Sequence, residues 1–259
     1  MINKILNGDC LELMKDIPSK SIDMILCDLP YGKTDCKWDN IIPFDKLWEQ
    51  YERIIKDNGA IVLTASQPFT TDLIMSNRKL FRYELIWEKS CISSPMLANK
   101  RILPKHENIL IFYKKQPTYK PQKTNCETNR SRNIKGKSII PFRGEGCYGD
   151  FIRTEKQYDK SRFPNSVLKF KNPPRNNQFV KNLSIHPTQK PVALFEYLIK
   201  TYTIEGMIVL DNCSGSGTTA IACINTNRNY ICIEKDETYF KLSVDRVNNH
   251  TQQMELIPC

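Results

Sequence analysis

The chain has 259 residues, of which 40% are hydrophobic and 25% are charged, and this balance is typical of a folded globular protein. No apolar run approaches the roughly 18 residues that span a bilayer, and the first residues lack the apolar core of a signal peptide. These features exclude a membrane-spanning class and a secretory leader, so we expect a cytoplasmic protein. The formal net charge is +10, and residues 114–182 hold 17 Lys and Arg against 5 Asp and Glu. Such a basic segment predicts a polyanionic partner, although a merely soluble insert would have the same composition.

Ten cysteines and three histidines raise the possibility of disulfide bonds or a metal site. The cysteines form no Cys-x-x-Cys pair, and the histidines are scattered along the chain. Without a secretory signal, reduced thiols are the expected state. We therefore expect neither a disulfide framework nor a metal.

The first predicted elements are a strand, a turn and a helix. Asn7-Gly8-Asp9-Cys10 follows a short apolar run and precedes Leu11-Glu12-Leu13-Met14, which has helical character. Asp9 could be no more than the N-cap of this helix. The next apolar run, Ile22 to Cys27, has the length and β-branched content of a buried strand.

That second strand ends at Asp28-Leu29-Pro30-Tyr31-Gly32. Ligands bind at the carboxyl edge of open α/β sheets, so these residues are placed to contact one. Asp28 and the carbonyls of Leu29 and Pro30 only accept hydrogen bonds, which suits them to hold both hydrogens of an exocyclic amine. Tyr31 offers a flat face on which a base can stack. The alternative is a strand followed by a simple turn.

Periodicity predicts the remaining elements as far as residue 113. A polar loop with Trp38 could cover the site, and a helix over 44–56 is expected to stop at Asn58-Gly59. The segments that follow are a strand at 60–64, a helix at 68–75 and strands at 81–87 and 108–113.

Between residues 114 and 182 the periodicity disappears, and aromatic residues interleave with cations, as on a surface that stacks nucleic-acid bases. Regular order returns with a helix at 192–202, a strand at 207–210, a helix to 225, a strand at 230–233 and a last helix towards 249. About seven strands separated mostly by helices predict an α/β fold with a twisted, largely parallel sheet.

A glycine bend, Asp211 to Thr219, joins a predicted strand to a helix. Gly215 and Gly217 permit a tight turn and a close approach of the backbone to a ligand. Glu234 ends the following strand, where a carboxylate can accept hydrogen bonds from two ribose hydroxyls. The bend fits a dinucleotide or an adenosyl cofactor. A dehydrogenase usually begins with its glycine turn, whereas only 42 residues follow Gly217 here.

These motifs and their order resemble the amino-directed DNA methyltransferases of the β arrangement. Asp28-Leu29-Pro30-Tyr31 is similar to the D-P-P-Y of that family, and Asp211 to Thr219 is similar to D-P-F-x-G-S-G-T-T. His186 to Pro191 resembles the segment that holds the methionine end of the cofactor. Glu234 resembles the acid that binds the ribose. Asn7 to Cys10 resembles the opening segment, which lies near the adenine. The D-L-P-Y variant resembles orphan enzymes of phages and mobile elements.

The resemblance implies a Rossmann-like, S-adenosylmethionine-dependent methyltransferase. Residues 1–113 would form the catalytic half, 114–182 a target-recognition insert and 183–259 the cofactor-binding half. Double-stranded DNA would be the partner, a homodimer is plausible, and nothing in the sequence indicates whether a cognate restriction nuclease exists.

The resemblance also implies roles for individual residues. Asp28, Pro30 and Tyr31 would act on the flipped-out base. The cofactor would contact Asp9, Cys10, Asp28, Thr188, Lys190, Asp211, Cys213, Gly215, Gly217, Thr218 and Glu234. Alternatively, Lys190 could begin the next helix and face solvent. Asn212 and Cys213 depart from the Pro and Phe of the family motif, so less surface would pack against the cofactor.

An aspartate at position 28 favours adenine N6 as the acceptor, since serine is commoner at that position in cytosine N4 enzymes. Cytosine N4 remains the alternative within this class. A nicotinamide-dependent oxidoreductase would explain the glycine bend without the basic insert. A non-catalytic DNA-binding module would explain only the insert.

Overall fold

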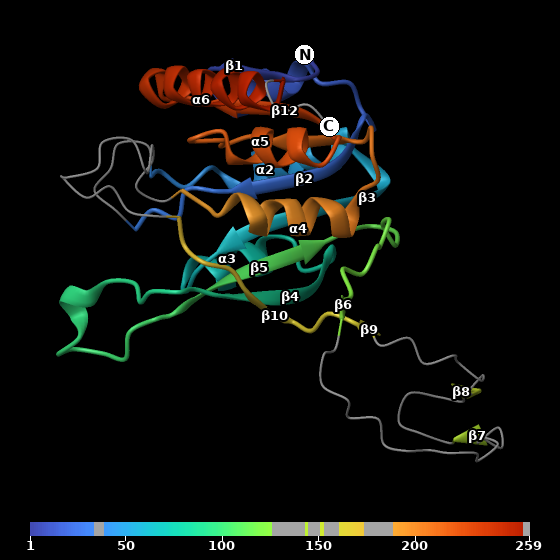
Figure 1. Cartoon of the computed structure of the whole chain (residues 1–259), viewed down its shortest axis with the longest axis vertical. Coiled ribbons are helices and arrows are strands. Elements are labelled where there is room, and N and C mark those ends of the chain that lie inside the picture. Colours follow the sequence, from blue (N-terminus) through green and yellow to red (C-terminus); the bar gives the residue numbers. More distant parts are fainter. Residues whose placement is uncertain (34–38, 126–142, 145–150, 153–160, 174–188, 256–259) are drawn as a thin grey trace. The chain divides into compact units, whose positions relative to one another are not determined.

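The computed structural model describes residues 1–33, 39–125, 143–144, 151–152, 161–173 and 189–255. Within this part of the chain an eight-stranded sheet, in the order β1-β12-β11-β2-β3-β5-β4-β10, forms the centre of the fold (Figure 1). Its strands are β1 (Lys4–Asn7), β2 (Ile22–Asp28), β3 (Ile55–Ala65), β4 (Phe81–Glu88), β5 (His106–Phe112), β10 (Val167–Lys169), β11 (Ile208–Asp211) and β12 (Asn229–Glu234).

The first five strands in the sheet order, β1, β12, β11, β2 and β3, pair in parallel. Strand β5 is antiparallel to its neighbours β3 and β4, and β10 is parallel to β4. The predicted α/β class with a largely parallel sheet is confirmed. The additional strand β10 comes from the stretch in which the sequence shows no periodicity, because three residues are too few to produce an alternating pattern.

Helices cover both faces of the sheet (Figure 1). They are α1 (Cys10–Leu13), α2 (Phe44–Ile54) and α3 (Phe69–Ser76) on one face, and α4 (Val192–Tyr202), α5 (Thr218–Asn225) and α6 (Glu237–Glu255) on the other. Short 3₁₀ turns follow α1 (η1, Met14–Asp16) and β4 (η2, Pro95–Leu97). Alternate side chains of β2 enter the two cores: Ile25 packs with α2, and Leu26 packs with α4. Burial on both faces explains why β2 is a continuous apolar run.

The register of the parallel strands brings three carboxylates to one edge of the sheet. Leu210 of β11 pairs with Ile25 of β2, so both strands end at this edge, at Asp211 and Asp28. Asp211 in turn pairs with Cys232 of β12, two residues before Glu234.

The predicted helix end at Asn58-Gly59 is wrong. Helix α2 ends at Ile54, and both residues lie inside β3, beside an irregularity in its pairing with β2. A Cβ atom at position 59 would come within 2.7 Å of the Ile55 side chain and 2.9 Å of the Asp23 carbonyl oxygen. The glycine therefore permits a close approach of chains within the sheet.

The chain forms two compact units, residues 1–120 with 165–259, and residues 121–164. In the smaller unit β6 (Thr124–Asn125) pairs with β9 (Ser161–Arg162), and β7 (Arg143–Gly144) pairs with β8 (Phe151–Ile152). The assignment of 114–182 as a target-recognition insert stays a prediction. No helix of the described residues is both long enough and apolar enough to cross a membrane.

Candidate active site

A cavity of about 760 Å³ opens at the carboxyl edge of the parallel strands. This volume is in the range of small-molecule sites. It is lined by the predicted site residues Asp9, Cys10, Asp28, Pro30, Tyr31, Lys190, Asp211, Cys213, Gly215, Thr218 and Glu234. The Asp28 turn and the Gly215 bend thus lie around a single cavity. Trp38, His186 and Thr188 lie outside the described residues.

Gly217 is predicted to contact the cofactor but is not among the lining residues. It is the N-cap of α5, with a φ of 75° that favours glycine. A Cβ atom there would lie 3.2 Å from the Cβ of Ser243. Gly217 therefore closes the bend and lets α5 approach α6.

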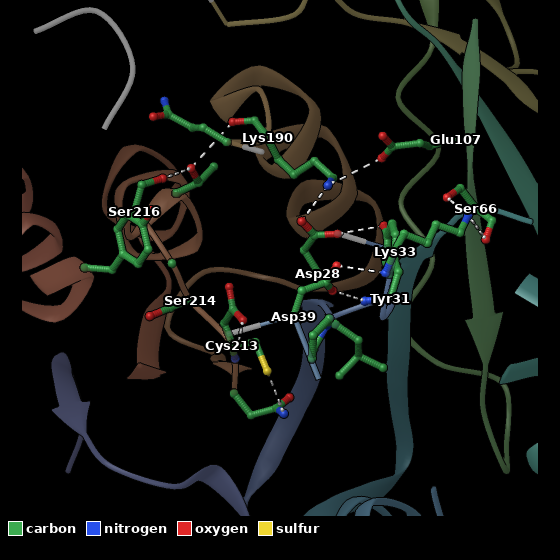
Figure 2. A pocket seen from close by; sticks show the side chains of 18 of the residues that line it. Asp28, Tyr31, Lys33, Asp39, Ser66, Glu107, Lys190, Cys213, Ser214 and Ser216 are labelled. Carbon is green, nitrogen blue, oxygen red and sulfur yellow. Dashed lines mark hydrogen bonds and ion pairs between the residues drawn. The ribbon is translucent and has the colours of Figure 1, made fainter. Parts of the chain in front are cut away.

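Both carboxylate oxygens of Asp28 have partners in the cavity (Figure 2). Oδ1 accepts hydrogen bonds from the Tyr31 hydroxyl, at 2.8 Å, and from the Thr64 hydroxyl. Oδ2 lies 2.5 Å from Nζ of Lys190. Two hydroxyls and an ammonium thus fix the carboxylate at the end of β2.

Tyr31 is held at both its hydroxyl and its ring. Its ring stacks on Phe69, with centroids 5.1 Å apart and planes inclined by 29°. Burial, followed by the charge of Asp28, raises the pKa of the Tyr31 hydroxyl well above its usual value, so the hydroxyl stays a donor. Stacking of a base on Tyr31 stays a prediction.

Asp39 organises the loop after the tetrapeptide, and the sequence reasoning missed it. Its carboxylate accepts hydrogen bonds from the backbone N–H groups of Tyr31, Gly32 and Lys33, at 2.8, 2.9 and 2.9 Å. The side chain is 6% exposed, although it comes from a polar stretch. An acidic residue in such a stretch carries no signal that distinguishes it from a solvated one.

Lys190 does not face solvent, so that alternative is wrong. Its side chain is 6% exposed, and Nζ lies between Asp28 and Glu107 (Figure 2). Burial by itself would lower the pKa of Lys190, but the charges of Asp28 and Glu107 outweigh it and hold that pKa above its usual value. The ammonium is therefore retained throughout the neutral range.

Glu107 and Lys89, which form an ion pair, also line the cavity and were missed. Burial would raise the pKa of Glu107, but Lys190 and Lys89 outweigh it and lower that pKa. Glu107 lies at the amino end of β5. Because β5 is antiparallel, its amino end meets the carboxyl ends of the parallel strands. Glu107 therefore cannot be predicted from the residues at the carboxyl ends of the strands.

Glu234 lies against the glycine bend on the cavity wall. The Glu234 carboxylate accepts backbone hydrogen bonds from Gly215 at 2.7 Å and from Asp236 at 2.8 Å. Burial, the largest effect, raises its pKa. Nearby, Oγ of Ser214 is buried without a hydrogen-bond partner among the described residues. A fixed acceptor beside an unused hydroxyl and a close backbone suits the ribose of an adenosyl group.

Asp9 and Asp211 have structural partners as well as a place on the cavity wall. Asp9 is the N-cap of α1, accepting from the Leu11 N–H at 3.0 Å, and it pairs with Lys235 at 3.0 Å. Asp211 is 3% exposed and accepts hydrogen bonds from the Thr219 hydroxyl and the Cys213 N–H. Its burial raises the pKa of the carboxyl to about 7.

Comparison with known proteins identifies one family. The DNA methylase family matches residues 22–245 of the chain. The DNA adenine methyltransferase YhdJ of Escherichia coli (strain K12) is 29% identical over 259 residues, which cover 94% of this chain and 82% of YhdJ. The type II methyltransferase M.HinfI of Haemophilus influenzae is 28% identical over 273 residues, covering 95% of this chain and 68% of M.HinfI.

Solved structures share the fold. The cytosine-N4-specific PvuII DNA methyltransferase superposes with a TM-score of 0.65 at 17% identity, covering 97% of this chain and 92% of that one. The M1.HpyAVI complex with SAM gives a TM-score of 0.59 at 23% identity, covering 94% and 98%.

Proposed function

Given that the chain belongs to the DNA methylase family and is an S-adenosylmethionine-dependent DNA methyltransferase, we propose that it methylates the N6 amine of adenine in double-stranded DNA. Family membership sets aside the nicotinamide oxidoreductase and the non-catalytic DNA-binding module.

The observation that carries the proposal is the position of Asp28. Its carboxylate ends β2, lines the cavity that Gly215 and Glu234 also line, and is fixed by Tyr31 and Thr64. An aspartate, rather than a serine, at this position favours an adenine acceptor. The likeness to YhdJ, which is named as an adenine methyltransferase, supports the same base.

S-adenosylmethionine supplies a methyl group that its sulfonium already activates. The residues of the chain must make a weak nucleophile attack it, because the N6 lone pair is delocalised into the adenine ring. On this proposal Asp28 and the Pro30 carbonyl accept the two amine hydrogens and stabilise positive charge as it develops on nitrogen. Tyr31 stacks on the extruded base and offsets part of the cost of extrusion, about a few kcal/mol.

The cofactor-binding roles are proposed from the family resemblance, and the cavity lining, which includes most of these residues, supports them. Glu234 accepts hydrogen bonds from the ribose hydroxyls, and Asp9 and Cys10 lie beside the adenine ring. Lys190 binds the carboxylate of the cofactor's methionine end, and we assign the same role to Thr188. Asp211, Cys213, Gly215, Gly217 and Thr218 shape the bend that approaches the cofactor.

Cytosine N4 is the second candidate acceptor, since it offers a similar amine and the PvuII enzyme of the same fold is cytosine-N4-specific. A homodimer and an orphan, phage-type origin stay predictions.

The test is incubation with methyl-labelled S-adenosylmethionine and unmethylated double-stranded DNA, followed by digestion and mass spectrometry of the nucleosides. Label in N6-methyladenine is the expected result. Label in N4-methylcytosine would show that cytosine, and not adenine, is the acceptor base. Absence of label from both nucleosides would overturn the proposal.

A further inference from the structure

Four charged side chains from four separate segments of the chain line the cavity and form a continuous series of ion pairs. Asp28 ends β2, Lys190 precedes α4, Glu107 belongs to β5, and Lys89 follows β4. Figure 2 shows the Lys190 ammonium between the carboxylates of Asp28 and Glu107. Two acids and two bases alternate, so the group as a whole is balanced in charge.

Lys190 is shared unequally between the two carboxylates. Its Nζ lies 2.5 Å from Oδ2 of Asp28 but 3.4 Å from Oε2 of Glu107. Oε1 of Glu107 pairs with Lys89, whereas Oε2 is buried and has no hydrogen bond among the described residues. Buried acceptors normally have a donor, so Oε2 can accept a full hydrogen bond from the ammonium with which it is already ion-paired.

This arrangement conflicts with the acceptor role of Asp28. Oδ1 is already bonded to the hydroxyls of Tyr31 and Thr64, and Oδ2 faces Lys190. The ammonium weakens Oδ2 as an acceptor for an incoming amine, because a hydrogen bond between two charged groups is the stronger and draws on the same oxygen. Oδ2 has a second lone pair and can accept from the amine beside Lys190, but Asp28 holds the amine most strongly once Lys190 withdraws.

We propose that Lys190 moves from Asp28 to Glu107 when the target amine binds, which makes Glu107 a positioning residue for methyl transfer. The proposal rests on the proposed role of Asp28. A small shift of a flexible lysine side chain completes the hydrogen bonding of Oε2 and frees Oδ2 in one step. Lys89 keeps Glu107 in place through Oε1. The ammonium stays paired throughout, so no unpaired cation is left buried.

The movement is one of the ammonium, with no proton transfer. The charges around Lys190 hold its pKa above the usual value, and those around Glu107 hold its pKa below. Both groups therefore stay ionised across the neutral range.

The test is E107Q, which keeps the shape of the side chain and removes its charge. With saturating cofactor and DNA, we expect the single-turnover rate of methyl transfer to fall about tenfold. The dissociation constants for S-adenosylmethionine and DNA should stay within about threefold of wild type, because Lys190 and the cavity wall remain. E107D restores the charge at a shorter reach, and its rate should lie between those of E107Q and wild type.

The matched control is E88Q on the neighbouring strand. Glu88 pairs with Lys105 and Lys169 outside the cavity, so the methyl-transfer rate of the E88Q protein should stay within about twofold of wild type. An E107Q protein with wild-type rate would overturn the proposal. So would a loss of rate matched by equal losses of binding and thermal stability, or an E107D rate no better than that of E107Q.

D28A separates this inference from the proposed function, with methyl groups counted in DNA whichever base accepts them. A fully active D28A protein would remove the proposed site itself. An inactive D28A protein together with a fully active E107Q protein would remove only the movement of Lys190.

Discussion

The Tyr51 hydroxyl donates a 2.5 Å hydrogen bond to the side-chain carbonyl of Asn212, across 161 residues of sequence. Both side chains are buried, and burial raises the pKa of Tyr51 well above its usual value, so the donor is never lost near neutral pH. The bond ties α2 to the glycine bend. It also explains how the chain accommodates an asparagine where the family motif has proline, since the polar amide has a partner.

Y51F should therefore destabilise the fold. Removing the hydroxyl leaves Oδ1 of Asn212 buried without this donor, and we expect the free energy of unfolding to fall by about 1–3 kcal/mol. Chemical denaturation measures it. The control is Y113F. Among the described residues the Tyr113 hydroxyl bonds to exposed Gln116, so the effect of Y113F should stay within about 0.5 kcal/mol. A Y51F protein as stable as wild type would show that the bond contributes nothing.

D28N should abolish most of the activity while the protein stays folded. The amide keeps the shape of the side chain but places a donor or a neutral acceptor where positive charge develops, so we expect the methyl-transfer rate to fall at least about a hundredfold. The measurement is transfer of labelled methyl to DNA, with circular dichroism to check folding. D57N, a change at an exposed aspartate paired with surface lysines, should be fully active. Comparable rates for D28N and D57N would remove Asp28 from the mechanism.

E234Q should weaken cofactor binding. Its amide would place N–H donors against the backbone N–H of Gly215 or Asp236, which now donate to the carboxylate, and would leave one acceptor fewer for the ribose. We expect the dissociation constant for S-adenosylmethionine to rise about tenfold or more in calorimetry, with DNA affinity unchanged. E237Q, on the exposed first turn of α6, is the control. Unchanged cofactor affinity in E234Q would contradict the assigned role.

Asp211 should make stability depend on pH in a predictable direction. Burial raises the pKa of this carboxyl from 3.8 to about 7, so between these values the folded chain holds a proton that the unfolded chain has lost. Its contribution to stability is full at low pH, is lost as the pH rises towards 7, and is constant above that.

D211N mimics the protonated carboxyl at every pH. Relative to this variant, wild type should lose about 1.4 kcal/mol of unfolding free energy per pH unit between the two pKa values. Denaturant titrations at several pH values below 7 measure the difference. A constant difference would mean that Asp211 does not titrate in this range.

The half of the site that lies on the parallel strands was predictable from the amino-acid sequence. Apolar runs indicate β2, β11 and β12. Parallel strands end at the same edge, so the sequence predicts that Asp28, Asp211 and Glu234 lie around one cavity, as they do. The glycine bend was predictable for the same reason, because backbone conformation limits which residues can form it.

The half of the site around Glu107 depends on how distant elements pack together. Hydrophobic periodicity states which residues are buried, but it does not state in which direction a strand pairs, and the antiparallel pairing of β5 is what brings Glu107 to Lys190. Asp39 and Gly59 depend likewise on partners that are distant or not encoded by any local pattern. Local sequence specifies burial and turns, whereas the partner of a buried charge is set only when separate elements pack together.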